Sequence, residues 1–136
     1  MKDQQNSFSR AWLPVLLWMI FIFILSSVPG KEIPDLSIPQ FHKVVHFFEY
    51  TVLGGLWLRA LLLSSSRVAG FKASILAWAL TALFALSDEW HQTFVSGRSG
   101  ELDDVLFDVC CAVLGILLYF SARSRLIRKT RTSVGS

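Results

Sequence analysis

Charged residues are scarce in this sequence, and their scarcity points to its class. They make up 17% of the 136 residues, whereas about 25% is usual for a soluble domain. Hydrophobic residues make up 53%, and the mean hydropathy is +0.51. A soluble globular domain is therefore disfavoured, and the composition predicts an integral membrane protein.

Cysteine is also scarce, which excludes a disulfide-based fold. The two cysteines, Cys110 and Cys111, are adjacent within an apolar run. Adjacent cysteines rarely form a disulfide, and one pair cannot make a disulfide framework. A tetrahedral zinc site also needs more ligands of this kind. Both cysteines are therefore predicted to be small buried residues.

Four apolar segments are long enough to cross a bilayer, which takes about 20 residues in a helix. Strands are disfavoured because the runs do not alternate, and an open sheet cannot satisfy its backbone in lipid. The first segment follows two basic residues like a signal peptide, but its core is long and no A-x-A-like site follows. The sequence predicts an all-α polytopic membrane protein with a single domain (residues 1–136), four spans (residues 11–28, 44–63, 73–92 and 104–121) and a basic tail (residues 122–136).

Lysine and arginine are distributed unevenly between the predicted loops. With the N-terminus inside, ten of the 13 fall on the cytoplasmic side, and only Lys31, Lys43 and Arg98 lie outside. This bias predicts that both termini are cytoplasmic. Because the basic residues flank apolar segments, their expected partner is the anionic surface of the lipid bilayer, and no nucleic-acid partner is expected.

Several acidic residues lie inside the predicted spans, close to the outer ends. A helical rise of 1.5 Å per residue places Glu49, Asp88 and Asp108 roughly 6–8 Å inward from those ends. Ionisable residues at such depth are costly, face the bundle interior and mark functional sites by default. The three carboxylates are therefore predicted to meet in a polar pocket that opens outward.

Helical spacing supports this packing. His42, His46 and Glu49 are spaced i, i+4 and i+7, and so lie on one face of the second span. Small residues on a helix let a second helix approach closely. Such residues accompany the acids in two places, with Gly54 and Gly55 on the second span and a stripe of Asp104, Asp108, Cys111 and Gly115 on the fourth.

Two stretches, HKVVHFFEYTVLGGL and SDEWHQTFVSGRSGELDDVLFDVCCAVLG, resemble the signatures of the VanZ-like family, which are small bacterial membrane proteins named for a teicoplanin-resistance protein. The resemblance extends from about Leu13 to Tyr119 and includes the SSVPG turn. It departs from the family pattern at His42, where an aspartate is frequent, and at Cys111, where a glycine is usual. It implies a four-helix fold, a multi-pass location in the bacterial cytoplasmic membrane and a link to glycopeptide tolerance, but no particular reaction. The motif residues that match are Lys43, His46, Tyr50, Asp88, Glu89, Gln92, Arg98, Asp104 and Asp108.

The predicted binding pocket combines these motif residues with Glu49, and its function is left open between several classes. The first is binding of an envelope or lipid-linked ligand, because convergent polar groups in a concave site suit recognition. The second is acid–base catalysis, with Glu49 or Asp88 beside His46. Ion or proton conduction is a third. A structural network that fixes helix packing, with Lys43 and Arg98 as counter-ions, is the fourth.

The sequence predicts no metal and no cofactor. His42, His46 and Glu49 are the metal-ligand candidates, because H-x-x-x-H places two imidazoles on one helix face, but the full zincin pattern is missing. A homo-oligomer formed through an unused small-residue face is compatible with the sequence.

Overall fold

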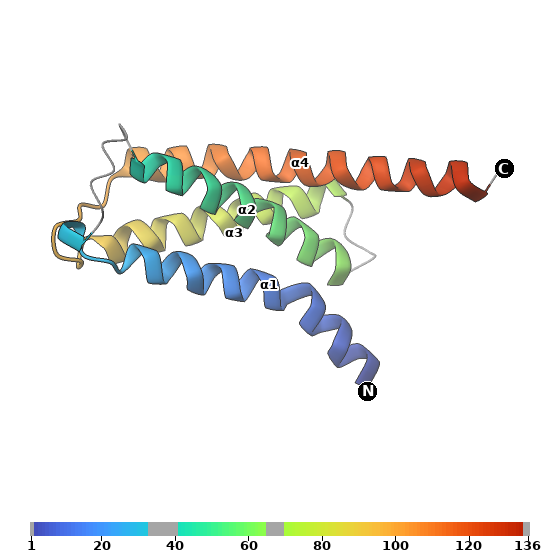
Figure 1. Cartoon of the computed structure of the whole chain (residues 1–136), viewed down its shortest axis with the longest axis horizontal. Coiled ribbons are helices and arrows are strands. Elements are labelled where there is room, and N and C mark those ends of the chain that lie inside the picture. The colour runs from blue at the N-terminus through green and yellow to red at the C-terminus, as the bar shows by residue number, and fades with distance from the viewer. Residues whose placement is uncertain (1, 33–40, 65–69, 135–136) are drawn as a thin grey trace.

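The computed structural model describes residues 2–32, 41–64 and 70–134, and the side chains of residues 8–32, 41–64 and 70–126. These residues form four α-helices and one 3-10 turn, with no strand among them (Figure 1). Each of the four helices is long and apolar enough to cross a membrane. The prediction of an all-α protein with four spans is therefore confirmed.

Each helix begins before its predicted span, although the first helix ends two residues before the predicted end at residue 28. Their bounds are α1 Lys2–Ser26, α2 Phe41–Ser64, α3 Gly70–Gln92 and α4 Leu102–Val134, and the 3-10 turn η1 is Gly30–Glu32. Hydropathy marks the part of a helix that suits lipid, whereas the helix itself continues into polar residues at either end. The largest difference is in α4, which continues through the basic tail to Val134.

Both chain termini lie at one end of the bundle, and the η1 turn and the loop of residues 93–101 lie at the other (Figure 1). The four helices therefore alternate in direction, and their even number brings both ends of the chain to the same end of the bundle. The predicted cytoplasmic location of the termini stays a prediction. This prediction depends on several basic residues that lie outside the described parts of the chain. They are the side chains of Lys2, Arg128, Lys129 and Arg131, and all of Arg67.

Helix α2 packs against the other three helices, and most extensively against α4. Small residues bring these two helices into backbone contact. A Cβ on Gly54 would lie 2.6 Å from the carbonyl oxygen of Ala112, and a Cβ on Gly115 would overlap the carbonyl oxygen of Thr51. The predicted role of these glycines in close helix approach is therefore confirmed.

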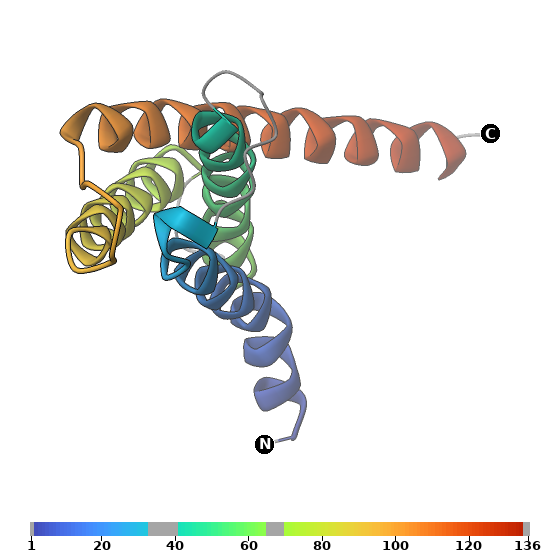
Figure 2. The same cartoon turned by 60° about the vertical axis from the view of Figure 1, so that its left-hand side comes forward.

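Helix α1 bends in its N-terminal half (Figures 1 and 2), and Pro14 lies inside this helix. Proline has no backbone N–H, so the carbonyl four residues earlier loses its helical partner. That carbonyl belongs to Arg10, and Arg59 of α2 donates a hydrogen bond to it at 3.1 Å. An arginine near the end of α2 thus compensates for the proline in α1.

The surface of the bundle is apolar and its interior is partly polar, as expected of a protein surrounded by lipid. Exposed large side chains such as Leu17 and Leu117 cover the outside, whereas Asp88 and Asp108 are buried. Cys111 is buried as predicted, but Cys110 is exposed. The prediction for Cys110 is wrong because neighbouring residues on a helix point about 100° apart, and only one of them faces α2.

Candidate functional site

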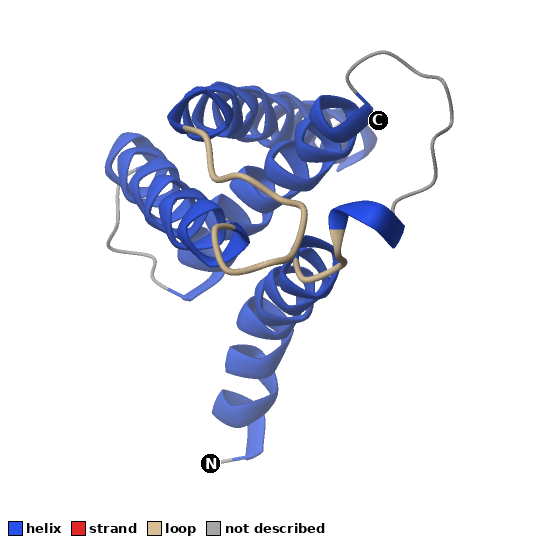
Figure 3. Ribbon diagram, turned by 90° about the vertical axis from the view of Figure 1, so that its left-hand side faces the viewer, coloured by secondary structure: helices blue, strands red, loops and turns tan. Residues whose placement is uncertain are grey.

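The loop of residues 93–101 folds over the end of the bundle beside η1 (Figure 3). The backbone N–H of Gly30 donates to the carbonyl of Ser96 at 3.0 Å. Arg98 donates to the carbonyls of Leu25 (3.2 Å) and Val28 (3.3 Å). The side chain of Arg98 therefore binds carbonyls at the end of α1, where helical hydrogen bonding stops, although the Leu25 carbonyl also accepts the backbone N–H of Val28 at 3.2 Å.

Asp88 of α3 joins three helices through one oxygen. Its Oδ2 accepts hydrogen bonds from Ser26 of α1 (2.9 Å), Tyr50 of α2 (3.2 Å) and Gln92 of α3 (3.2 Å). All four residues are buried. Three donors that converge on one carboxylate oxygen hold the helices in register. Asp88 is thus the centre of a packing network.

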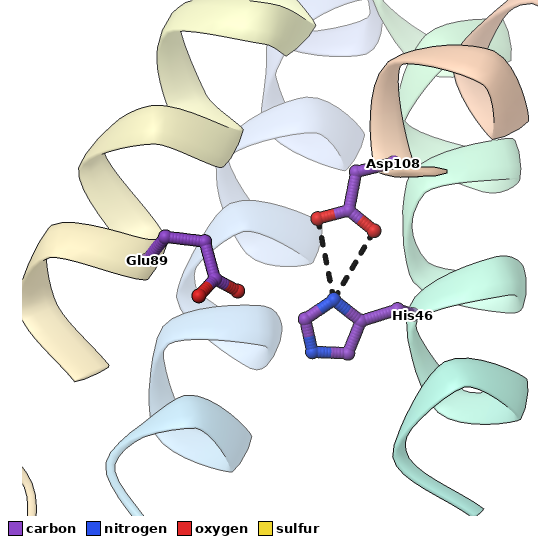
Figure 4. Close-up of side chains that lie close together, drawn as sticks. All are labelled: His46, Glu89 and Asp108. Carbon is purple, nitrogen blue, oxygen red and sulfur yellow. Dashed lines mark hydrogen bonds and ion pairs between the residues drawn. The ribbon is translucent and has the colours of Figure 1, made fainter. Parts of the chain in front are cut away.

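His46 and Asp108 form a second group, between α2 and α4 (Figure 4). His46 Nδ1 lies 3.1 Å from Asp108 Oδ1 and 3.2 Å from Oδ2. Glu89 of α3 approaches the same place, and one ligand atom from each of the three residues lies within 4.8 Å of the others. Glu89 Oε2 accepts the backbone N–H of Glu101 at 2.9 Å. The three side chains are 5% exposed or less.

Asp104 lies at the outer edge of the same end. Its carboxylate is 3.9 Å from both Lys43 Nζ and His42 Nε2. His42 is exposed and points to Asp104, whereas His46 lies one turn deeper and is buried. Only two of the candidate metal ligands proposed from the sequence, His46 and Glu49, are therefore buried together.

A cavity of about 400 Å³ lies between the ends of α1 and α2. Its apolar wall includes Leu25, Phe41 and Val45. Its polar lining includes His46 and Glu49, and Glu49 Oε1 is buried without a hydrogen-bond partner among the described residues. An apolar wall with a few convergent polar groups is typical of a binding site for an amphipathic molecule.

The structure divides the predicted pocket residues between four settings. His46, Glu49 and Arg98 line the cavity. The Asp88 network holds Tyr50 and Gln92, and Gln92 also contacts Glu89 at 3.4 Å and Arg98 at 3.4 Å. Asp108 and Glu89 lie behind His46, and Lys43 and Asp104 lie at the edge.

Two features of the site could not be expected from the residue pattern. Arg98, which was a candidate counter-ion, donates to carbonyl groups and to Gln92 and to no carboxylate among the described residues. The residue pattern does not single out Ser26, which donates to Asp88. Its only signal in the sequence is a hydroxyl at the end of an apolar span.

The fold and the site together define a multi-pass membrane protein with four helices and a buried polar cluster at one end. The family model described as VanZ/LLP1 matches residues 11–126, and the chain belongs to this family. The resemblance found in the sequence is therefore confirmed. Comparisons with curated proteins and with solved structures gave no match.

Proposed function

We propose that the protein binds the polar group of an amphipathic envelope ligand in the cavity between α1 and α2. The cavity would open to the outer side of the bacterial cytoplasmic membrane, and binding would contribute to tolerance of a glycopeptide such as teicoplanin or to maintenance of the envelope. The observation that carries the proposal is the unpartnered, buried Glu49 Oε1 on the lining of a largely apolar cavity.

The reason is energetic. A buried carboxylate oxygen without a hydrogen bond costs about 1–3 kcal/mol or more, and burial at membrane depth increases the penalty. A ligand that brings an ammonium or hydroxyl group to Glu49 removes this penalty. The apolar wall near Phe41 and Val45 then accepts the hydrocarbon part of the same molecule, as in a lipid-linked compound.

Replacing Glu49 by glutamine tests this proposal. In a deletion strain that produces the variant, we expect glycopeptide susceptibility to rise to the level of the deletion strain, while the amount of folded protein is unchanged. Glu101→Gln is the matched control, because Glu101 is exposed and outside the cavity lining. If Glu49→Gln keeps full tolerance, or loses tolerance only in proportion to lost folded protein, the binding proposal is wrong.

One observation supports a second candidate function, a membrane enzyme acting on a lipid-linked substrate. Asp108 holds Nδ1 of His46, and a carboxylate in this position orients an imidazole ring for proton transfer through its other nitrogen. If the protein is such an enzyme, a strain that produces it should contain different lipid-linked precursors from a deletion strain. Identical precursor profiles in producing and deletion strains would contradict this second candidate and leave the binding proposal unaffected.

A further inference from the structure

Three neighbouring helices each place one metal-ligating side chain at a common point (Figure 4). His46 comes from α2, Glu89 from α3 and Asp108 from α4, and their ligand atoms lie within 4.8 Å of one another. Residues far apart in the sequence thus converge, whereas the candidates proposed from spacing alone all lie on α2. Among the described side chains, this is the group with metal-ligand spacing.

The distances within the group suit a small metal ion. Zinc binds histidine nitrogen and carboxylate oxygen at about 2.0–2.2 Å, so adjacent atoms of a tetrahedral set lie roughly 3.3 Å apart. The observed separation between His46 Nδ1 and the oxygens of Asp108 is 3.1–3.2 Å. Two ligands therefore already have the required spacing, and a carboxylate oxygen of Glu89 lies within 4.8 Å of both.

The charges in the group also call for a cation. Asp108 is fully buried and Glu89 is 5% exposed. Among the described residues, no lysine or arginine lies within 4.0 Å of either carboxylate. Two carboxylates at membrane depth without a full counter-ion are costly. A divalent cation with neutral His46 would make the group neutral overall.

Glu49 supplies an independent indication of a missing partner. Its buried Oε1 has no hydrogen bond among the described residues, and Glu49 lines the cavity together with His46. Glu49 follows His46 by three residues, so the two side chains lie on the same helix face. An unpartnered acceptor thus lies beside the convergent ligands, where a metal-bound water would find a hydrogen-bond acceptor.

We propose that His46, Glu89 and Asp108 bind a divalent transition-metal ion at the wall of the cavity. One imidazole and two carboxylates suit Zn²⁺, Fe²⁺ or Mn²⁺. Three protein ligands leave a coordination position for water or for an anionic oxygen of a ligand, as in catalytic zinc sites. This inference shares the Glu49 observation with the proposed ligand binding, but its test measures metal binding by the protein alone.

The test uses the full-length protein, purified in detergent without a polyhistidine tag and freed of metal with a chelator. Titration calorimetry with Zn²⁺, and separately with Mn²⁺, measures stoichiometry and affinity. We expect one ion per chain and a higher unfolding temperature in its presence, because a ligand that binds only the folded state stabilises it. A chain that binds neither ion would overturn the proposal.

Conservative variants locate the site. Glu89→Gln, Asp108→Asn and His46→Gln should each weaken Zn²⁺ binding by about 100-fold or more, beyond the roughly 10–100-fold typical of outer-shell residues. The matched controls are the less buried Glu101→Gln, Asp103→Asn and His91→Gln, which should bind as the unmodified protein does. Unchanged Zn²⁺ affinity in the first set of variants would contradict the assignment. Loss of Zn²⁺ binding on replacement of His42, with binding kept on replacement of His46, would contradict it as well.

A spectroscopic measurement covers the case in which a variant does not fold. Co²⁺ added to the metal-free, unmodified protein should give the intense visible absorption of a four- or five-coordinate site, and Zn²⁺ should abolish it by competition. A spectrum no stronger than that of Co²⁺ in buffer would overturn the proposal without any variant. A failure here leaves the Glu49 experiment unaffected, so the two proposals are distinguishable.

Discussion

Gly115→Ala is expected to prevent the normal packing of α4 against α2. The added Cβ would overlap the carbonyl oxygen of Thr51, which is backbone and cannot rotate away as a side chain can. Overpacking of this kind costs about 1–3 kcal/mol and sometimes more, and we expect the upper end or beyond. The folded fraction in detergent, measured by size-exclusion chromatography and by the unfolding temperature, should fall sharply.

Two other glycines on this interface serve as graded controls. A Cβ on Gly54 would lie 2.6 Å from the Ala112 carbonyl oxygen, and one on Gly55 would lie 3.3 Å from that of Gly115. Alanine also favours a helix over glycine by about 0.5–1 kcal/mol. The expected order of destabilisation is therefore Gly115→Ala, then Gly54→Ala, with Gly55→Ala close to neutral. Equal stability in all three variants would show that α2 and α4 do not approach this closely.

Asp88→Ala is expected to destabilise the bundle by about 3 kcal/mol or more. The substitution leaves three buried donors, on Ser26, Tyr50 and Gln92, without their common acceptor. Each unsatisfied buried donor costs about 1–3 kcal/mol, although the three costs are not additive because their sites are coupled. The unfolding temperature and the yield of monodisperse protein measure the effect.

Asp88→Asn separates the role of the oxygen from that of the charge. Asparagine keeps one oxygen acceptor of the same shape, so it should retain most of the stability that alanine loses. Asp103→Ala removes an exposed carboxylate from the first turn of α4 and should have little effect. A stable, monodisperse Asp88→Ala protein would contradict the view that Asp88 joins three helices.

Some parts of the fold could be predicted from the sequence. The spans follow from length and hydropathy, and the close approach at Gly54 and Gly115 follows from small residues on helix faces. The positions of the helix ends do not follow from length and hydropathy. His42, Lys43 and most of the basic segment after residue 121 are polar, and a polar residue at the end of a span is helical or not according to its backbone hydrogen bonds, which hydropathy does not report.

The site was predictable only in part. Helical spacing placed His46 and Glu49 on one face and Asp108 at a similar depth. Which residue of one helix meets which residue of another depends on the rotation and axial shift of whole helices. The convergence of Glu89 with His46, and the bonds from Arg98 to the end of α1, are properties of this packing and have no local signal in the sequence.

The structure also separates two explanations that the sequence left together. The Asp88 network satisfies its donors within the protein and fits the structural explanation of the acid cluster. Glu49 Oε1 is buried without a hydrogen-bond partner among the described residues, as Asp88 Oδ1 is, but of the two residues only Glu49 lines the cavity, which fits ligand binding. Variants at the two positions should therefore differ, with stability lost at Asp88 and tolerance lost at Glu49.

Native mass spectrometry of the protein released from membranes tests ligand binding in the cavity most directly. The comparison includes the unmodified chain, Glu49→Gln and Val45→Trp, in which the larger side chain fills the space beside the apolar wall. We predict that the unmodified protein carries one amphipathic molecule per chain and that both variants lose it while they remain folded and monodisperse. The same bound molecule, at the same occupancy, in all three proteins would contradict the assignment of this cavity as a binding site.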